Sequence, residues 1–439
     1  MNLEKTRSTF ILGAGMTGLA AGIASGLPVF EASDAPGGIC SSYYIRPGEK
    51  ERLQQPPDDG EAYRFDIGGG HWIFGGEPSM LRFIGSHVSL KRYVRHSAVY
   101  FQDRDLYVPY PLQNHLRFLD KEVIVRALTE MAQQQGTFRS MKEWMTKSFG
   151  PTLCELFFYL FHDLYTAGLY DRIAPQDAYK SPVDLMLAIR GALDEAPSVG
   201  YNATFVYPEE DLNTLARRMA SQCKMHYNKQ VERIEVREKK VLFSDGTTKP
   251  YDQLISTLPL NKMMEITGLE VEQKTDPCTS VLVLNIGAVR GERCPDQHWL
   301  YNTATDSGFH RVGFYSNVDP AFLPRSAQTD GNRVAIYVER AYADAQRPSE
   351  EEIQLYGGKV VKELQEWEYI GDAEVVDPTW IEVAYTWNWP DSGWMNQALR
   401  KLEAYGIYQV GRYARWSFQG IADSVRDGFQ AGASFRTLS

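Results

Sequence analysis

The chain of 439 residues has little cysteine and no excess of positive charge, and both shortages exclude classes of protein. Its five cysteines are scattered, without the Cys-x-x-Cys spacing of a zinc site and without the density of a disulfide framework. The formal net charge of -10 at pH 7 gives no support to nucleic-acid binding. We therefore predict neither a bound metal nor a nucleic-acid partner.

Long apolar runs are also missing. No stretch approaches the roughly eighteen consecutive apolar residues of a membrane-spanning helix, and the first residues lead almost at once into a strand pattern. The sequence thus indicates neither a membrane span nor a signal peptide, and the simplest expected location is the cytosol. With 43% hydrophobic residues and a length beyond one hydrophobic core, the chain is expected to form two domains.

Residues 9 to 42 carry the strongest functional signal. An apolar strand runs into the turn Gly-Ala-Gly-Met-Thr-Gly, then a small-residue helix and a second strand that ends in an acid. Glycines at these spacings permit a tight turn, close approach of backbone amides to a pyrophosphate, and packing of helix on strand. The acid falls where a carboxylate accepts both hydroxyls of an adenosine ribose. The predicted dinucleotide ligands are Gly13, Gly15, Met16, Thr17, Gly18, Glu31 and Ala32.

The residues that follow Glu31 favour FAD over NAD. Gly37 and Gly38 supply a second backbone turn where a diphosphate would continue toward a flavin, although an ordinary surface turn is the alternative interpretation. The whole stretch resembles the extended fingerprint of the flavoprotein superfamily of amine oxidases, protoporphyrinogen oxidases and UDP-galactopyranose mutases. The resemblance implies FAD as cofactor. It also implies an α/β fold, with a Rossmann-type (GR2-like) FAD-binding domain and an inserted α+β substrate domain.

A second glycine-dense segment, Phe65 to Trp72, contains three consecutive glycines. Such a run costs backbone entropy and tends to be kept where another group comes very close. The segment resembles the Gly-Gly-His element of protoporphyrinogen oxidase-like proteins and the Gly-x-His-Ile-Phe element of the mutases, which lies beside the reactive flavin nitrogen. The resemblance implies flavin contacts for Gly69, Gly70 and His71, with His71 a catalytic candidate. A structural histidine is the alternative.

The C-terminal segment predicts a strand that delivers Gly411 and Arg412 to a cleft, followed by a helix from about 421 to 430. A helix N-terminus there would stabilise negative charge on a reduced flavin. The segment resembles the closing FAD motif of the superfamily, which implies cofactor roles for Gly411, Arg412, Ser424 and Val425 and a catalytic role for Arg412. An alternating hairpin near 230 to 246 resembles the region that holds the adenine edge, and there Val231 is the implied contact.

Between these segments the pattern changes. Residues 43 to 64 are polar and turn-rich, as in an exposed excursion, and residues 81 to 200 predict amphipathic helices at 116 to 135 and 141 to 164. Strands near 279 to 288, 298 to 316 and 333 to 340 predict a second sheet under a substrate cavity. We expect residues 1–80, 201–270 and 400–439 to form the FAD-binding domain, and residues 81–200 and 271–399 the substrate domain.

Two groups of residues are candidates for substrate binding. A proline-stiffened loop at 108 to 116 resembles a Tyr-Pro-x-Gln-Asn segment of mutase-like flavoproteins and suits a sugar hydroxyl, with a helix-capping turn as the alternative. Arginines could bind a phosphate through paired hydrogen bonds, or form surface salt bridges. The candidates are Tyr110, Gln113, Asn114, Arg190, Arg311 and Arg340, with Arg311 also a catalytic candidate.

Two flavin chemistries and one non-catalytic function fit these motifs. The first is a UDP-galactopyranose mutase-like reaction on a nucleotide-linked sugar, with reduced flavin as nucleophile and no net redox change. The second is hydride removal from a small-molecule substrate by an oxidase or dehydrogenase of the amine oxidase or protoporphyrinogen oxidase type. The third is a Rossmann scaffold used for protein interaction. The sugar-like loop and the Gly-Arg-Tyr-x-x-Trp ending favour the first.

Overall fold

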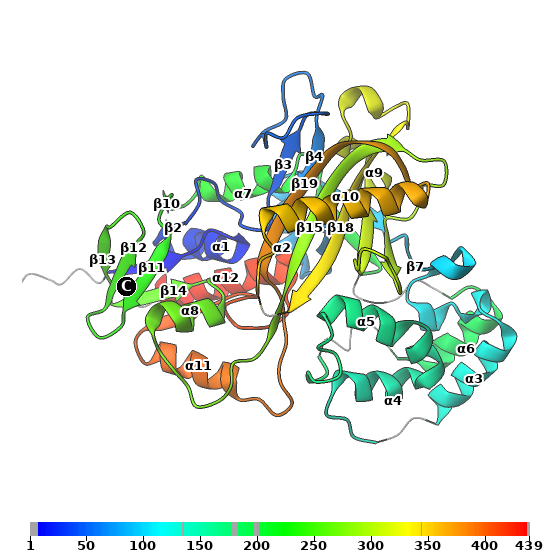
Figure 1. The fold of residues 1–439 in the computed structure, drawn as a ribbon. Helices are drawn as coiled ribbons and strands as arrows, with labels where there is room; N and C mark the ends of the chain where they lie inside the picture. The colour runs from blue at the N-terminus through cyan, green and yellow to red at the C-terminus, as the bar shows by residue number, and fades with distance from the viewer. Residues whose placement is uncertain are drawn as a thin grey trace, which may run out of the picture.

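The computed structural model describes residues 8–133, 136–176, 183–196, 200, 202–343 and 345–436. A five-stranded parallel sheet with the order β10-β2-β1-β14-β20 lies on the left of Figure 1. Its strands are β1 (Thr9–Leu12), β2 (Pro28–Phe30), β10 (Lys224–His226), β14 (Gln253–Ser256) and β20 (Ile407–Gln409). Parallel strands connected through helices are the expected Rossmann-type arrangement, and the predicted α/β fold is confirmed.

Two helices from opposite ends of the chain lie side by side on this sheet. They are α1 (Met16–Ser25) and α12 (Ile421–Arg436), the latter longer than predicted. Gly428 makes the close contact possible, because a Cβ there would lie 2.2 Å from the carbonyl oxygen of Thr17. A Cβ on Gly432 would similarly lie 2.5 Å from the carbonyl oxygen of Ala21. These contacts set the middle of α12 against α1, and Gly411 packs beside the start of α1, where its Cβ would lie 2.6 Å from Oγ1 of Thr17. The two terminal motifs are therefore adjacent.

A larger, seven-stranded sheet has the order β19-β15-β18-β17-β16-β7-β8, and α10 (Glu350–Glu366) covers one of its faces. The strands are β7 (Ser97–Phe101), β8 (Leu106–Pro109), β15 (Cys278–Arg290), β16 (Trp299–Asn302), β17 (Arg311–Phe314), β18 (Arg333–Ala343) and β19 (Ile370–Thr386). The predicted strand at 298 to 316 is two strands, and β19 was not predicted. β19 is an edge strand of mixed polarity that contains Pro378, which an edge tolerates.

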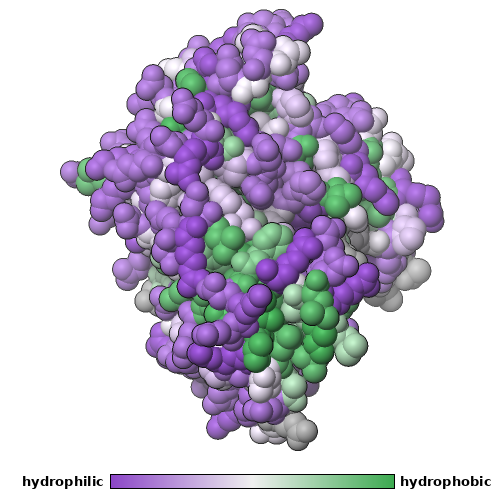
Figure 2. Space-filling model, turned by 90° about the vertical axis from the view of Figure 1, so that its right-hand side faces the viewer, coloured by the Kyte–Doolittle hydropathy of each residue, from purple (hydrophilic) through white to green (hydrophobic). Residues whose placement is uncertain are grey.

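A group of helices adjoins the far end of this sheet. It contains α3 (Lys121–Ala132), α4 (Met141–Leu153), α5 (Tyr159–Thr166) and α6 (Leu185–Leu193). The predicted helix at 141 to 164 is interrupted, because Gly150 has a φ of +79° and Pro151 follows it. Figure 2 faces this side and shows apolar groups at the surface; exposed apolar residues on these helices include Val125, Leu160, Met186 and Leu193.

Three small antiparallel sheets complete the fold. They are β3 (Ser42–Ile45) with β4 (Tyr63–Asp66), then β5 (Ile73–Phe74), β9 (Thr204–Pro208) and β6 (Leu90–Val94), and finally β11 (Val231–Glu235), β12 (Lys240–Phe243) and β13 (Thr248–Pro250). The predicted excursion at 43 to 64 was too long, because its two ends are the buried strands β3 and β4. None of the helices that the structure describes is long and apolar enough to cross a bilayer.

Candidate active site

A cavity of about 420 Å³ lies between the five-stranded sheet, the seven-stranded sheet and α5. This volume is within the range of small-molecule sites. Predicted cofactor residues from four separate segments line it: Gly15, Met16, Thr17, Gly37, Gly38, Gly70, His71, Gly411, Arg412 and Ser424. The N- and C-terminal motifs therefore converge on one cavity.

The glycine turn after β1 leaves open space in front of α1. A Cβ on Gly15 would meet nothing within 4 Å, whereas a Cβ on Gly18 would lie 1.9 Å from the carbonyl oxygen of Gly13. Gly13 itself has a φ of +92°, a conformation that favours glycine. The N-terminus of α1 has no side-chain cap, so its backbone N–H groups point into the space that Gly15 leaves. This cradle fits a diphosphate.

The acid after β2 stands at the edge of the same turn. Oε2 of Glu31 accepts a hydrogen bond of 2.7 Å from the backbone N–H of Ala14, and Oε1 accepts one of 3.0 Å from Ser33. Gly37 forms a parallel bridge to Gly15, so the second glycine turn extends the first instead of forming an isolated surface turn. Ala32 is exposed. The arrangement fits the adenosine and diphosphate portions of FAD.

The Gly-Gly-His segment lies between this cradle and the seven-stranded sheet. A Cβ on Gly70 would lie 2.5 Å from the Tyr337 hydroxyl, and a Cβ on Gly69 would lie 2.8 Å from Oε1 of Glu339. Gly69 thus packs against β18 and does not line the cavity. Burial, together with the positive charge of Arg412, lowers the pKa of His71 to about 4. The His71 imidazole is therefore neutral at physiological pH.

A buried hydrogen-bond network holds the start of this segment. Oδ1 of Asp66 accepts hydrogen bonds from the hydroxyls of Tyr207, at 2.7 Å, and Ser42, at 2.8 Å. The Asp66 carbonyl accepts one of 2.8 Å from the Asn285 amide on β15. The network ties the Gly-Gly-His segment to the second sheet.

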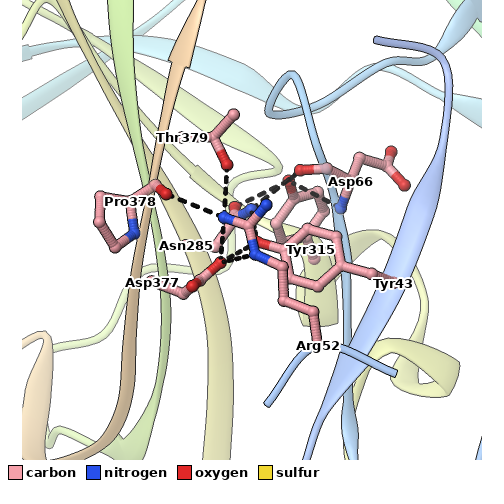
Figure 3. A network of polar contacts seen from close by, with 8 residues as sticks. All are labelled: Tyr43, Arg52, Asp66, Asn285, Tyr315, Asp377, Pro378 and Thr379. Atoms are coloured by element: carbon pink, nitrogen blue, oxygen red, sulfur yellow. Dashed lines mark hydrogen bonds and ion pairs between the residues drawn. The ribbon is translucent and has the colours of Figure 1, made fainter. Parts of the chain in front are cut away.

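Figure 3 shows how the same network continues outward from β15. Asn285 also donates to the hydroxyl of Tyr43, which in turn donates to Asp377 on β19. Arg52 donates to the same Asp377 carboxylate at 2.9 Å. A continuous chain of polar groups therefore runs from the Gly-Gly-His segment to the surface.

Changing Asp66 to asparagine should alter the pH dependence of stability. Burial raises the pKa of Asp66 from 3.8 to about 7, so the folded state holds a proton that the unfolded state releases. Wild-type stability should therefore fall, relative to Asp66→Asn, as the pH rises from 3.8 to about 7, and the difference should stay constant above that. Urea unfolding across this range measures it. A parallel pH dependence of the two proteins would contradict the raised pKa of Asp66.

Arg412 projects from the segment after β20 into the cavity. Its guanidinium donates to the carbonyl oxygens of Ala384, at 3.0 Å, and Gln419, at 3.3 Å, and lies 4.6 Å from the centre of the Phe418 ring. Burial raises the pKa of the Tyr385 hydroxyl to about 12, and the positive charge of Arg412 opposes this rise. Arg412 thus places positive charge in the cavity, whose wall also includes the start of α12.

Arg412→Ala should leave FAD bound but make its reduction potential more negative, because the protein loses positive charge that favours the reduced, anionic ring. We expect a shift of roughly 30 mV, which is about 1.4 kcal/mol for a two-electron couple. Dye equilibration during anaerobic reduction measures the potential. Arg415→Ala is the matched control, because Arg415 is exposed and does not line the cavity. Equal potentials in all three proteins would remove Arg412 from the site.

Arg311 lies on the opposite wall, paired with Glu339. The two residues are directly opposite each other on β17 and β18, and Nη2 of Arg311 donates to Oε1 of Glu339 at 2.6 Å. The Arg311 side chain is 23% exposed, whereas that of Glu339 is only 3% exposed. Arg311 lowers the pKa of Glu339 to about 2 despite burial. Glu339 therefore remains ionised behind Arg311.

An aromatic wall closes the rest of the cavity. Its members, which sequence reasoning did not identify, include Trp72, Phe74, Phe157, Phe161, Tyr165, Tyr301, Tyr385 and Phe418. Phe157, Phe161 and Tyr165 are spaced by four residues, which places them on one face of the helical segment. That spacing was the available signal. The other members come from strands and loops that are distant in the sequence.

Several predicted substrate residues lie elsewhere. Tyr110 and Arg311 line the cavity, but Gln113 and Asn114 form a buried 3-10 turn against α6. Arg190 is exposed on α6. Arg340 is on the other face of β18, 4.9 Å and 5.0 Å from the rings of Tyr342 and Tyr356, because successive side chains of a strand point to opposite faces. Gln113, Asn114, Arg190 and Arg340 therefore do not line the cavity, and a role for them in substrate binding stays a prediction.

Seven predicted cofactor residues lie outside the cavity lining: Gly13, Gly18, Glu31, Ala32, Gly69, Val231 and Val425. Val425 is fully buried in the core between α12 and its neighbours, one position past Ser424, which does line the cavity. Val231 begins β11 and packs beside the core around Phe30 and Phe243. A contact of its backbone with adenine stays a prediction. Among the described residues, no group of three His, Cys, Asp or Glu side chains could hold a metal ion.

The sequence model of the flavin-containing amine oxidoreductases matches residues 21–431. The chain belongs to this family. Its fold is similar to that of reduced UDP-galactopyranose mutase, with a TM-score of 0.82, 22% identity, and coverage of 99% of this chain and 96% of the other. A putative protoporphyrinogen oxidase from Exiguobacterium sp. 255-15 has a TM-score of 0.73 and 13% identity over 99% and 100% of the two chains. Putrescine oxidase bound to putrescine has a TM-score of 0.56 and 16% identity over 98% and 99%.

Membership of this family confirms the predicted resemblance, the FAD cofactor and the prediction of an enzyme. The identities to the solved structures are low, so those similarities establish the fold alone. The protein is an FAD-dependent flavoenzyme of the amine oxidase superfamily.

Proposed function

We propose that this flavoenzyme acts on a nucleotide-linked sugar in a redox-neutral reaction like that of UDP-galactopyranose mutase. One observation carries the proposal: two guanidinium groups, that of Arg311 on β17 and that of Arg412 in the segment after β20, line one cavity beside the Gly-Gly-His segment. Guanidinium groups are suited to a diphosphate because they offer paired hydrogen bonds to its oxygens. The high TM-score to UDP-galactopyranose mutase supports a similar arrangement of the cavity walls.

The bound cofactor would supply a flavin ring and, once reduced, a nucleophilic nitrogen. The protein's own residues would position the substrate. Arg311 and Arg412 would hold the diphosphate as it leaves the sugar carbon, and the phenols of Tyr301 and Tyr385 would hydrogen-bond to sugar hydroxyls. The aromatic wall would exclude water from the reacting carbon. We propose the predicted cofactor ligands that line the cavity as the FAD contacts, and we retain the predicted domain boundaries and cytosolic location as proposals.

A second candidate function is oxidation of a small, largely apolar substrate by hydride transfer. Two observations favour this oxidation. The Glu339 carboxylate already balances the charge of Arg311, and the aromatic wall suits an apolar substrate. Amine oxidation through a lysine in the cavity has no support, because no described residue that lines the cavity is a lysine.

Anaerobic assays of the FAD-loaded protein with a panel of UDP- and GDP-sugars test the proposal. Conversion of a sugar nucleotide only after dithionite reduction, without consumption of an electron acceptor, is the expected result. Steady consumption of oxygen or dye with a substrate, and no rearranged sugar, would favour the oxidase. Absence of rearrangement with every reduced sample would contradict the mutase-like function.

A further inference from the structure

His310 is a buried histidine that the proposed reaction does not use. It lies next to Arg311, lines the cavity wall, and its side chain is 1% exposed. Neither ring nitrogen makes a hydrogen bond within the described part of the chain. Nε2 lies 3.4 Å from Oε2 of Glu339, and Arg311 approaches the same carboxylate from the cavity side. The Glu339 carboxylate therefore lies between the more exposed Arg311 guanidinium and the buried His310 imidazole.

The groups around His310 keep its imidazole neutral in the absence of substrate. Burial lowers the pKa of His310, and the nearby Arg311 lowers it further, while Glu339 raises it. From α5, the rings of Phe161 and Tyr165 make edge contacts at 6.1 Å and 5.4 Å, and His162 also faces the cavity. Across the cavity wall, Tyr385 on β19 lies 3.5 Å from the Arg311 guanidinium. The Arg311–Glu339–His310 cluster thus has no net charge.

An anionic substrate would disturb this balance. The hydrogen bonds of Arg311 within the described part of the chain are made by Nη2, its buried Nε has no partner there, and the side chain, 23% exposed, lines the cavity. A diphosphate at Arg311 would weaken the attraction between Arg311 and Glu339 and add negative charge nearby. An opposite charge within about 4 to 6 Å typically raises the pKa of a base by 1 to 3 units. A buried carboxylate that loses its counter-ion is costly unless another cation replaces it.

We propose that binding of a diphosphate at Arg311 is coupled to proton uptake by His310, which then becomes a second counter-ion for Glu339. The proton comes from the solvent and leaves both imidazole nitrogens protonated, and the cluster changes from neutral to a charge of +1. His310 acts through Glu339 and is a positioning residue, not a catalytic one. This inference rests on the proposed function, because it requires an anionic substrate.

Isothermal titration of the FAD-loaded protein with UDP, in buffers of different ionisation enthalpy at pH 7, tests the coupling. The slope of observed enthalpy against buffer enthalpy counts the protons taken up, and we expect a positive slope approaching one proton. In His310→Gln the slope should vanish while UDP still binds. The affinity of the wild type should also weaken as the pH rises, whereas that of His310→Gln should not.

His298→Gln is the matched control. His298 is also buried, and burial lowers its pKa to about 4, but it does not line the cavity. This variant should keep the wild-type slope. UDP binding without proton uptake, or uptake that persists in His310→Gln, would overturn the inference and leave the proposed function intact. No binding of UDP would count against both. If His310→Gln fails to fold, imidazole ¹⁵N shifts of the labelled wild type report directly whether a histidine becomes protonated.

Discussion

Replacing Gly15 with valine is expected to give a folded protein that purifies without flavin. A Cβ at this position meets no protein atom within 4 Å, and the backbone has φ -68° and ψ 177°, which valine adopts readily. The protein itself thus tolerates the substitution. The branched side chain would instead fill the space in front of α1 through which the proposed diphosphate passes. Loss of the flavin absorption bands, with an unchanged far-ultraviolet dichroism spectrum, is the predicted outcome.

Two further variants separate this effect from damage to the fold. Gly358→Val is the matched control, because a Cβ on Gly358 in α10 is equally unobstructed and far from the cavity. It should keep its flavin. Gly18→Val should prevent folding, because its Cβ would lie 1.9 Å from the Gly13 carbonyl oxygen. Full flavin occupancy in Gly15→Val would show that the N-terminal assignment is wrong.

Glu339→Gln is expected to destabilise the fold by about 3 kcal/mol. Removing one partner of a buried ion pair typically costs 3 to 5 kcal/mol, and we take the lower figure because the Arg311 side chain is 23% exposed. Urea unfolding at neutral pH measures the difference. Glu210→Gln is the control, because Glu210 pairs with Arg218 at the surface, where both side chains are more than a third exposed. Its cost should stay below about 1 kcal/mol.

The cost of Glu339→Gln should also depend on pH. Because the pKa of Glu339 is lowered from 4.5 to about 2 in the folded state, its stabilisation is fully present above pH 4.5. It is lost as the pH falls from 4.5 toward 2, so the difference between wild type and variant should shrink over that range. A difference that stays constant down to acid pH would show that folding does not lower the pKa of Glu339.

The sequence by itself predicted FAD as the cofactor and the fold class, and both are confirmed. A strand, a glycine turn, a helix and an acid are consecutive along the chain, so their spacing alone specifies how Gly13, Gly15, Gly18 and Glu31 are arranged. Local backbone geometry dictates these positions, and no distant contact is needed to infer them. Gly411 and Arg412 were instead inferred from a resemblance to the closing motif of the superfamily, and their place beside the first motif depends on the pairing of β20 with β14.

Only the tertiary structure decided which side chains form the substrate end. Arg311 enters the cavity and Arg340 does not, because the strand pairing sets the face of the sheet on which each lies. Asn114 is buried because Gly191 of α6 comes so close that a Cβ there would lie 1.9 Å from its carbonyl oxygen. The placement of His310 beside Glu339 likewise depends on the pairing of β17 with β18. Such contacts join residues that are far apart in the sequence, so short-range sequence patterns cannot predict them.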